Sequence, residues 1–448
     1  MEEKKVVVLD NGGYTAKIGL ASSDLPRVVP NCMTKAKAER RRTFVGAELD
    51  ECKDKSGLYY VSAFQKGYMT NWDIEHVIWD YMFSKNCLKI KPESCHLALT
   101  EPVFNFPCIQ EALDEIIFED YRFQSLVRHW GPVYSAYSYS QQACATVACS
   151  SSDSNDTGNG SSTGSNSSSS GSSCTRAASS SRATLCSLVV DVGHSFTHVL
   201  PFIQGKVISS AVLRIDVGGK VLTNYLKDVT SYRQLNVMDE TYVVNQMKED
   251  CCFVSQDLVQ DMGIAKLRGK GNTIVGDYAL PDFQVLHRGA FKKRASTATP
   301  DGESSQAVDE QLQSIVLNNE RFSVPELLFH PSDIGIDQMG VCEAIVHAIS
   351  RTPIALHPHF YQNILVTGGS ASFPGMQGRM YRELRMLAPV DYKVVVSVAE
   401  NPTLHCWKSA AEFATNEEHA AKFTVTREEY EEHGRAVCQQ RFRHESSL

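Results

Sequence analysis

The chain has 448 residues, a net charge of −8, 42% hydrophobic and 21% charged residues, a composition typical of globular proteins and a length too great for one compact core. The negative charge excludes wholesale nucleic-acid binding, and no apolar run is long enough to span a membrane. The amino-terminal MEEKKVVVLD contains no apolar signal core, so we expect a nuclear or cytosolic protein whose 14 cysteines are reduced.

The first predicted element is a hairpin. Residues 5–9 form an apolar strand, Asp10-Asn11-Gly12-Gly13 forms a turn, and residues 14–20 form a second apolar strand. Two apolar runs around an acid and two glycines are typical of a β-hairpin with an exposed tip. The tip therefore presents a carboxylate and backbone N–H groups to any ligand that approaches it.

Polar and basic segments interrupt the predicted elements. Lys35–Arg42 (KAKAERRR) is densely basic; we interpret it as a solvated loop, with a contact to DNA phosphates as the alternative. Residues 149–184 are rich in Ser, Gly and Asn and lack the apolar residues of a core, which predicts a disordered insertion. A polar loop is predicted over residues 292–313. The basic segment Leu286–Arg294, which overlaps its start, is likewise interpreted as a solvated loop, with a contact to DNA phosphates as the alternative.

A second hairpin repeats the first. Residues 187–190 form an apolar strand, Asp191-Val192-Gly193 forms the turn, and residues 197–201 form the returning strand. Two copies of one hairpin predict two similar halves that face each other. Facing tips can grip a phosphate chain from both sides, while their aspartates hold a cation through water.

A third element follows the apolar strand 363–367. Gly368 and Gly369 come directly after this strand, and paired glycines allow the backbone to approach a flat ligand closely. Pro374 suits the first turn of the helix predicted over 376–387. Three such elements in order favour a nucleotide-binding site between the two halves.

Together these motifs resemble those of the actin family over nearly the whole ordered chain. The resemblance is carried by DNGGYTAKIGLAS, TNWD, LTEPVFN, DVGHSFTHVLP, LRIDVGGKVLTNYLK, FHPSDIG, LVTGGSASFPG and VTREEYEEHG, in this order. It implies an α/β actin-like fold in which two ribonuclease-H-like halves surround a central cleft, each with a smaller subdomain.

The resemblance also implies how the chain divides into lobes. The first large lobe would comprise 1–33, 70–148 and 404–448, and its small upper lobe 34–69. The second large lobe would comprise 185–216 and 337–403, and its small upper lobe 217–336.

By position, the resemblance assigns nucleotide binding to nine residues: Asp10, Gly12, Lys17, Asp191, Gly193, Lys248, Glu249, Gly368 and Gly369. Asp10 and Asp191 would hold the water shell of magnesium, and Lys17 would contact the phosphates. Lys248 and Glu249 would line the nucleoside pocket. Gln142 and His198 would position the attacking water.

Five residues depart from the family pattern: Tyr14, His194, Ser195, Asn245 and Thr403. His194 stands where the family has an acid, and an imidazole does not copy a carboxylate in a metal and water network. Two interpretations stay open. The cleft holds ATP, with magnesium only when it is occupied, or it is empty and Asp10 and Asp191 cap the hairpin tips while Lys17 pairs with one of them across the cleft. In both we expect no turnover.

Within the family, the chain resembles a nuclear branch of actin-related proteins. The resemblance is carried by LTNYLKDVTSYRQLNVMDETYVVNQMKEDCCFVSQD and FSVPELLFHPSDIGIDQMG. It implies a non-catalytic subunit of a Swr-type chromatin-remodelling complex, which exchanges a variant histone, with links to heterochromatin and with other subunits, histones and nucleosomes as partners. The alternatives are a nucleotide-hydrolysing, filament-forming cytoskeletal protein and a sugar-kinase-like phosphotransferase. The departures in the cleft and the insertion between the halves argue against filament growth.

Overall fold

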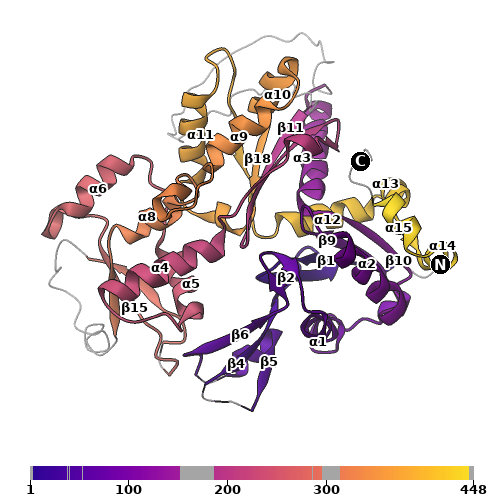
Figure 1. Ribbon diagram of the computed structural model, residues 1–448, viewed down its shortest axis with the longest axis horizontal. Helices are drawn as coiled ribbons and strands as arrows, with labels where there is room; N and C mark the ends of the chain where they lie inside the picture. Colours follow the sequence, from indigo (N-terminus) through magenta and orange to yellow (C-terminus); the bar gives the residue numbers. More distant parts are fainter. Residues whose placement is uncertain are drawn as a thin grey trace, which may run out of the picture.

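A computed structural model describes residues 4–442 except 38, 40, 53, 152–185, 285 and 295–312. Two halves lie side by side, each built on one large sheet with a small sheet beside it (Figure 1). The helices at the carboxyl end return to the amino-terminal half. Among the helices of the described residues, none combines the length and the apolar character that a membrane span requires.

The large sheet of the first half has six strands in the order β20-β10-β9-β1-β2-β3. They are β1 (Val6–Asn11), β2 (Thr15–Leu20), β3 (Arg27–Pro30), β9 (His96–Glu101), β10 (Ser125–Trp130) and β20 (Val425–Thr426). β1 and β2 form the predicted antiparallel hairpin, and β9 and β10 run parallel to β1. Val7 and Leu9 join one buried cluster, whereas Val8 joins another, because successive side chains of a strand point to opposite faces.

Helices cover both faces of this sheet. They are α1 (Trp72–Phe83), α2 (Pro107–Glu115), α3 (Gly131–Ser151), α12 (His405–Thr415), α13 (Glu417–Phe423), α14 (Arg427–His433) and α15 (Arg435–Arg441). The TNWD motif begins α1, where the Asn71 side chain accepts a hydrogen bond of 3.2 Å from the Ile74 N–H, a typical N-cap. α12 packs against α3 and β1, and the Trp407 indole N–H donates to the Val8 carbonyl at 3.0 Å. The carboxyl-terminal segment thus completes the core of the first half.

The large sheet of the second half repeats the topology of the first. Its order is β13-β12-β11-β18-β19, with β14 paired to β12. The strands are β11 (Cys186–Val192), β12 (Thr197–Ile203), β13 (Lys206–Val207), β14 (Leu213–Ile215), β18 (Ile364–Thr367) and β19 (Val396–Val398). β11 and β12 form an antiparallel hairpin, and β18 and β19 run parallel to β11, as β9 and β10 do to β1. The predicted repeat of two hairpins is therefore a repeat of two sheets.

The remaining helices and strands belong to the second half and to the upper lobes. The helices are α4 (Gly219–Arg233), α5 (Thr241–Cys251), α6 (Leu258–Lys266), α8 (Glu320–Glu326), α9 (Val341–Ser350), α10 (His357–Gln362) and α11 (Met376–Leu387). One small sheet contains β4 (Cys32–Ala36), β5 (Thr43–Val45) and β6 (Leu58–Ser62), and the other contains β15 (Gly276–Ala279), β16 (Ala290–Lys293) and β17 (Ser314–Leu317). β7 (Phe64–Gln65) and β8 (Tyr68–Met69) form a short hairpin.

Each sheet of three or more strands draws its strands from one predicted lobe, apart from the first two residues of β4. The lobe boundaries themselves stay a prediction. The predicted start of the polar loop is wrong, because Lys292 and Lys293 lie in β16. The rest of that loop, from 295 to 312, lies outside the described residues.

Two further predictions concern helix ends. Pro374 does not lie in the first turn of α11, which begins at Met376 after Gly375, whose φ of 90° is left-handed. The chain turns sharply there before the helix starts, and glycine permits that turn. Residues 149–151, predicted to begin the insertion, continue α3. The predicted disorder concerns 152–184, which lie outside the described residues.

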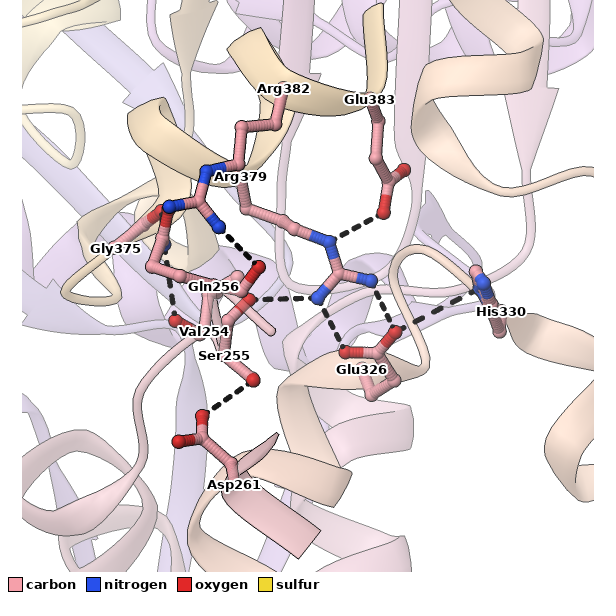
Figure 2. A network of polar contacts seen from close by, with 10 residues as sticks. All are labelled: Val254, Ser255, Gln256, Asp261, Glu326, His330, Gly375, Arg379, Arg382 and Glu383. Carbon is pink, nitrogen blue, oxygen red and sulfur yellow. Dashed lines mark hydrogen bonds and ion pairs between the residues drawn. The ribbon is translucent and has the colours of Figure 1, made fainter. Parts of the chain in front are cut away.

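A buried arginine joins three segments of the second half (Figure 2). Arg379 in α11 binds Glu326 in α8 through two hydrogen bonds, of 3.0 Å from Nη1 to Oε2 and 2.6 Å from Nη2 to Oε1. Its Nε donates to Glu383 at 2.5 Å, and its Nη1 donates to the Ser255 carbonyl at 2.8 Å. The side chains of Arg379 and Glu326 are 9% and 2% exposed, so this guanidinium and its bidentate carboxylate are withdrawn from water.

The first half contains a comparable arginine. Arg128 in β10 donates from Nη1 to Glu101 at 3.1 Å and from Nη2 to Asp114 at 3.2 Å. All three side chains are at most 2% exposed. Burial raises the pKa of Asp114 to about 6, although Arg128 acts in the opposite direction. Each half is thus held together by an arginine between two acids.

Candidate functional site

A cavity of about 650 Å³ lies where the two hairpin tips meet. Its walls contain all nine predicted nucleotide-binding residues, His198 and all five departures from the family pattern, but not Gln142. The residues come from both halves because the β1–β2 and β11–β12 turns face each other. The structure therefore brings together nearly every residue that the sequence singled out.

The first tip carries a neutralised acid. Asp10 lies opposite Lys17 in the β1–β2 register, and the Lys17 ammonium is 3.2 Å from the Asp10 carboxylate. The Thr100 hydroxyl donates to Asp10 at 2.8 Å. A Cβ on Gly12 would lie 2.8 Å from the Thr15 carbonyl oxygen, so the turn admits only glycine there. Lys17 does pair with one of the two aspartates, but the prediction that it does so across the cleft is wrong, because its partner Asp10 lies in the same hairpin.

A buried carboxyl group in α1 is hydrogen-bonded to this tip. Glu75 in α1 is fully buried and accepts a hydrogen bond of 2.8 Å from the Asn11 amide, whose oxygen accepts one of 2.8 Å from Asn31. Burial raises the pKa of Glu75 to about 7, although its hydrogen bonds act in the opposite direction. The tip is therefore tied to a side chain that prefers to be protonated.

This carboxyl group predicts a pH dependence of stability. The pKa of Glu75 is raised from 4.5 in the unfolded chain to about 7 in the folded protein, so its contribution to the free energy of unfolding is lost as pH rises through that window. Glu75→Gln keeps an acceptor for Asn11 but cannot titrate. Between pH 4.5 and 7.5 we expect the variant to gain about 2–3 kcal/mol relative to the wild type, measured by urea unfolding at stepped pH. Parallel pH profiles of the two proteins would contradict the prediction.

The second tip carries the other acid. Asp191 lies opposite His198 in the β11–β12 register. Burial and the nearby Asp10 carboxylate raise the pKa of Asp191 to about 6, with Lys17 acting in the opposite direction. A Cβ on Gly368, whose φ is +92°, would lie 2.6 Å from an Asp191 carboxylate oxygen. The first glycine after β18 is therefore required for Asp191 to keep its place.

The wall predicted to hold the nucleoside is already hydrogen-bonded to itself. The Lys248 ammonium donates to the Asn245 side-chain oxygen at 2.8 Å, to the Thr223 hydroxyl at 2.9 Å and to the Gly219 carbonyl at 3.2 Å. The Asn245 amide donates to Glu249 at 2.8 Å. Lys248 thus links α5 to α4, and burial lowers its pKa. Its three protons all have acceptors within the protein.

Three departures from the family pattern touch one another. The Tyr14 ring stacks on the His194 imidazole, with centroids 4.6 Å apart and an interplanar angle of 21°. The Asn245 amide donates to the Tyr14 hydroxyl at 3.1 Å. Burial, followed by the charge of Lys248 and of two other lysines, lowers the pKa of His194 to about 3. The imidazole is therefore neutral at physiological pH. We call the stacked pair Tyr14 and His194 the ring bridge.

The assignment of Gln142 to the attacking water is wrong. Gln142 is exposed, and its amide donates to the Ser138 hydroxyl at 3.4 Å. The part of α3 in the cavity wall is its first turn, Gly131 and Pro132. Eleven residues of helix place Gln142 about 16 Å farther along the axis. The signal that could have identified Gly131 is its place after β10, since a helix following a parallel strand points its amino terminus at the crevice.

His198 and Thr403 both line the cavity. The His198 Nε2 is buried and has no hydrogen-bond partner among the described residues, and burial with Arg214 nearby lowers its pKa to about 3. Thr403 lies beside Gly369, where an added Cβ would be 3.9 Å from its hydroxyl oxygen.

The two aspartates suit a cation only in part. In the described part of the chain, no three His, Cys, Asp or Glu side chains are grouped as ligands of a metal ion. Asp10 and Asp191 would have to share the ion with water and phosphate oxygens, which is how Mg²⁺ is commonly bound beside a nucleotide. The raised pKa of Asp191 fits this, since a carboxyl held against another carboxylate is relieved by a cation between them.

Two halves of one topology, with an Asp-Gly hairpin from each meeting at a shared cleft, define the actin fold. The chain belongs to the actin family, because the family model described as Actin matches residues 1–443. It is 42% identical to Actin-related protein 6 of Drosophila melanogaster, over 96% of this chain and 97% of that protein. It is 36% identical to Actin-related protein 6 of Arabidopsis thaliana, over 98% and 99%, and 36% identical to Actin-like protein ARP6 of Cryptococcus neoformans, over 99% and 85%.

Proposed function

We propose that this protein is a non-catalytic nuclear actin-related protein and a structural subunit of a Swr-type chromatin-remodelling complex, which exchanges a variant histone. Its similarity to proteins named Actin-related protein 6 extends over nearly the whole chain. The nuclear branch that the sequence resembles serves as such subunits. In that setting the fold supplies surface to other subunits, while a motor subunit hydrolyses ATP.

The observation that carries this proposal is the state of the reaction side of the cleft. Hydrolysis needs a positioned water and a well-held metal. His194 is neutral where the family has an acid, and the first turn of α3 presents Gly131 and Pro132, which have no side-chain amide to orient a water. A bound nucleotide, with magnesium, would therefore act as a clamp between the halves without turnover.

The basic run offers less free charge to DNA than its sequence suggests. Lys37 pairs with Asp239 of the other upper lobe at 3.0 Å, and Arg42 pairs with Glu51. Two cations of Lys35–Arg42 are thus neutralised within the chain, which leaves less charge for DNA phosphates. The Lys37 pair also joins the two upper lobes, which is a structural role.

Affinity capture of the tagged full-length protein from nuclear extract tests the proposal. We expect the eluate to contain a Swr-type motor subunit and to exchange histone variants on nucleosomes in an ATP-dependent way. The exchange should persist when Asp10→Ala is introduced into the captured chain, because the motor and not this subunit supplies the hydrolysis.

A sedimentation assay under polymerising salt, with magnesium and ATP, tests the filament-forming alternative. Purified actin under the same conditions is the matched control. Actin should sediment while this protein stays in the supernatant. An ATP-dependent pellet of this protein, with no motor subunit in the eluate, would support the filament-forming alternative and contradict the proposal.

A further inference from the structure

We propose that the ring bridge makes the cleft selective for a nucleoside diphosphate, or a shorter phosphate chain, over a triphosphate. The inference rests on the proposed function, in which the cleft binds a nucleotide without turnover, and it specifies the class of nucleotide that is bound. It depends on the contact between Tyr14 and His194, which the sequence identified as two separate departures from the family pattern.

The first step is the position of the ring bridge. Tyr14 ends the β1–β2 turn and His194 follows Gly193 in the β11–β12 turn, so both rings stand at the tips that would face a phosphate chain. Next to them, a Cβ on Gly13 would lie 3.2 Å from the Ser195 hydroxyl oxygen. The tips are thus in contact through the two rings, and Ser195 leaves little room for a side chain on Gly13. A terminal phosphate between the tips would have to separate the two rings.

The second step is that both turns are anchored, and the Tyr14 ring with them. The Tyr14 hydroxyl is held by Asn245, and its carbonyl accepts a hydrogen bond of 2.9 Å from the Asn31 N–H. The His194 carbonyl accepts one of 2.9 Å from the Lys220 N–H. A Cβ on Gly218 would lie 2.6 Å from that same carbonyl, so the start of α4 fits tightly against His194. The backbone that carries each ring is therefore tied to a neighbouring segment, Asn31 after β3 for Tyr14 and the start of α4 for His194.

The third step is charge. Three cations line the cavity, and each has an acceptor: Lys17 binds Asp10, Lys248 binds three oxygens of α4 and α5, and Arg288 binds Asp250 at 2.7 Å. The neutral His194 adds no positive charge. A third phosphate adds negative charge without gaining a free cation, and electrostatic attraction is what binds phosphate in such sites.

The cavity has room for a nucleoside diphosphate. Gly12, Gly193 and Gly368 leave backbone exposed along its wall, and its volume of about 650 Å³ lies in the range of small-molecule sites. The two phosphates nearest the nucleoside would lie between these glycines, with Asp10 and Asp191 available to a hydrated cation.

Isothermal titration calorimetry of the purified full-length protein with ADP and with ATP, each with magnesium, tests the inference. We expect ADP to bind at least tenfold more tightly than ATP. Tyr14→Gly and, from the other half, His194→Ala should each raise the affinity for ATP and bring the ratio to within about threefold. Tyr232→Ala, which removes a 93% exposed ring, is the matched control and should keep the wild-type ratio. Thermal unfolding checks that each variant is folded.

The outcomes separate the two proposals. ATP binding as tightly as ADP to the wild type, or a ratio unchanged in both Tyr14→Gly and His194→Ala, would overturn the selectivity. Binding of neither nucleotide would also overturn it, while the subunit role, tested by affinity capture, would stand. Release of phosphate from ATP by the purified protein would instead overturn the non-catalytic function.

Discussion

Replacing Arg379 by Met is expected to lower the free energy of unfolding by about 3–5 kcal/mol. The substitution keeps much of the apolar volume of the side chain but removes four hydrogen bonds, two of them to Glu326. Glu326 is 2% exposed, so its carboxylate would stay buried without its main cation. The loss is measured by urea unfolding, followed by circular dichroism.

Arg382→Met is the matched control on the same helix. Arg382 donates to the Gln256 carbonyl at 2.7 Å in an exposed position (Figure 2), and loss of such a bond is expected to cost at most about 1 kcal/mol. Equal losses in the two variants would mean that the buried network contributes no more than a surface bond, contrary to the prediction.

Replacing Arg128 by Met is expected to cost about 3–5 kcal/mol at pH 8 and less at pH 5. Glu101 and Asp114 would lose their shared cation, and both are buried. Asp114 already has its pKa raised to about 6 by burial, so at pH 5 it is largely protonated and the loss of the cation matters less. Thermal and urea unfolding at both pH values measure the difference.

Two comparisons sharpen this prediction. Arg435→Met removes an exposed pair with Glu111 and should cost less than about 1 kcal/mol. Adding Glu101→Gln and Asp114→Asn to Arg128→Met should recover part of the stability, because the uncompensated charges are then gone. A loss from Arg128→Met that is the same at pH 5 and pH 8 would contradict this account.

The hairpins and their repeat could be predicted from the sequence because they are local. An apolar run, an Asp-Gly turn and a second apolar run fix a hairpin whatever lies elsewhere in the chain. The site residues at the turns, Asp10 and Asp191, followed from the same pattern. Their closeness in space followed from the repeat, since two copies of one hairpin predict halves that face each other, and the resemblance to a family of known architecture supported it.

Contacts between distant segments could not be predicted from the sequence. Tyr14, His194 and Asn245 were each recognised as departures, but nothing in the chain shows that they touch, since they lie in different lobes. Gln142 was misplaced because helix α3 has no internal marker that fixes its alignment with the family. Arg128 and Arg379 resemble ordinary surface charges, and their acids lie on other elements or a turn away.

The ring bridge has a consequence for how the chain could have evolved. The two rings lie in hairpins from separate halves, so one substitution cannot supply both. One ring without the other has no ring to stack on. Once both are present and Asn245 holds the first, reverting Tyr14 or Asn245 breaks a contact without restoring the acid that the family has in the second turn. Reverting His194 restores that acid but leaves the Tyr14 ring without its stacking partner, so no single substitution returns both turns to the family pattern.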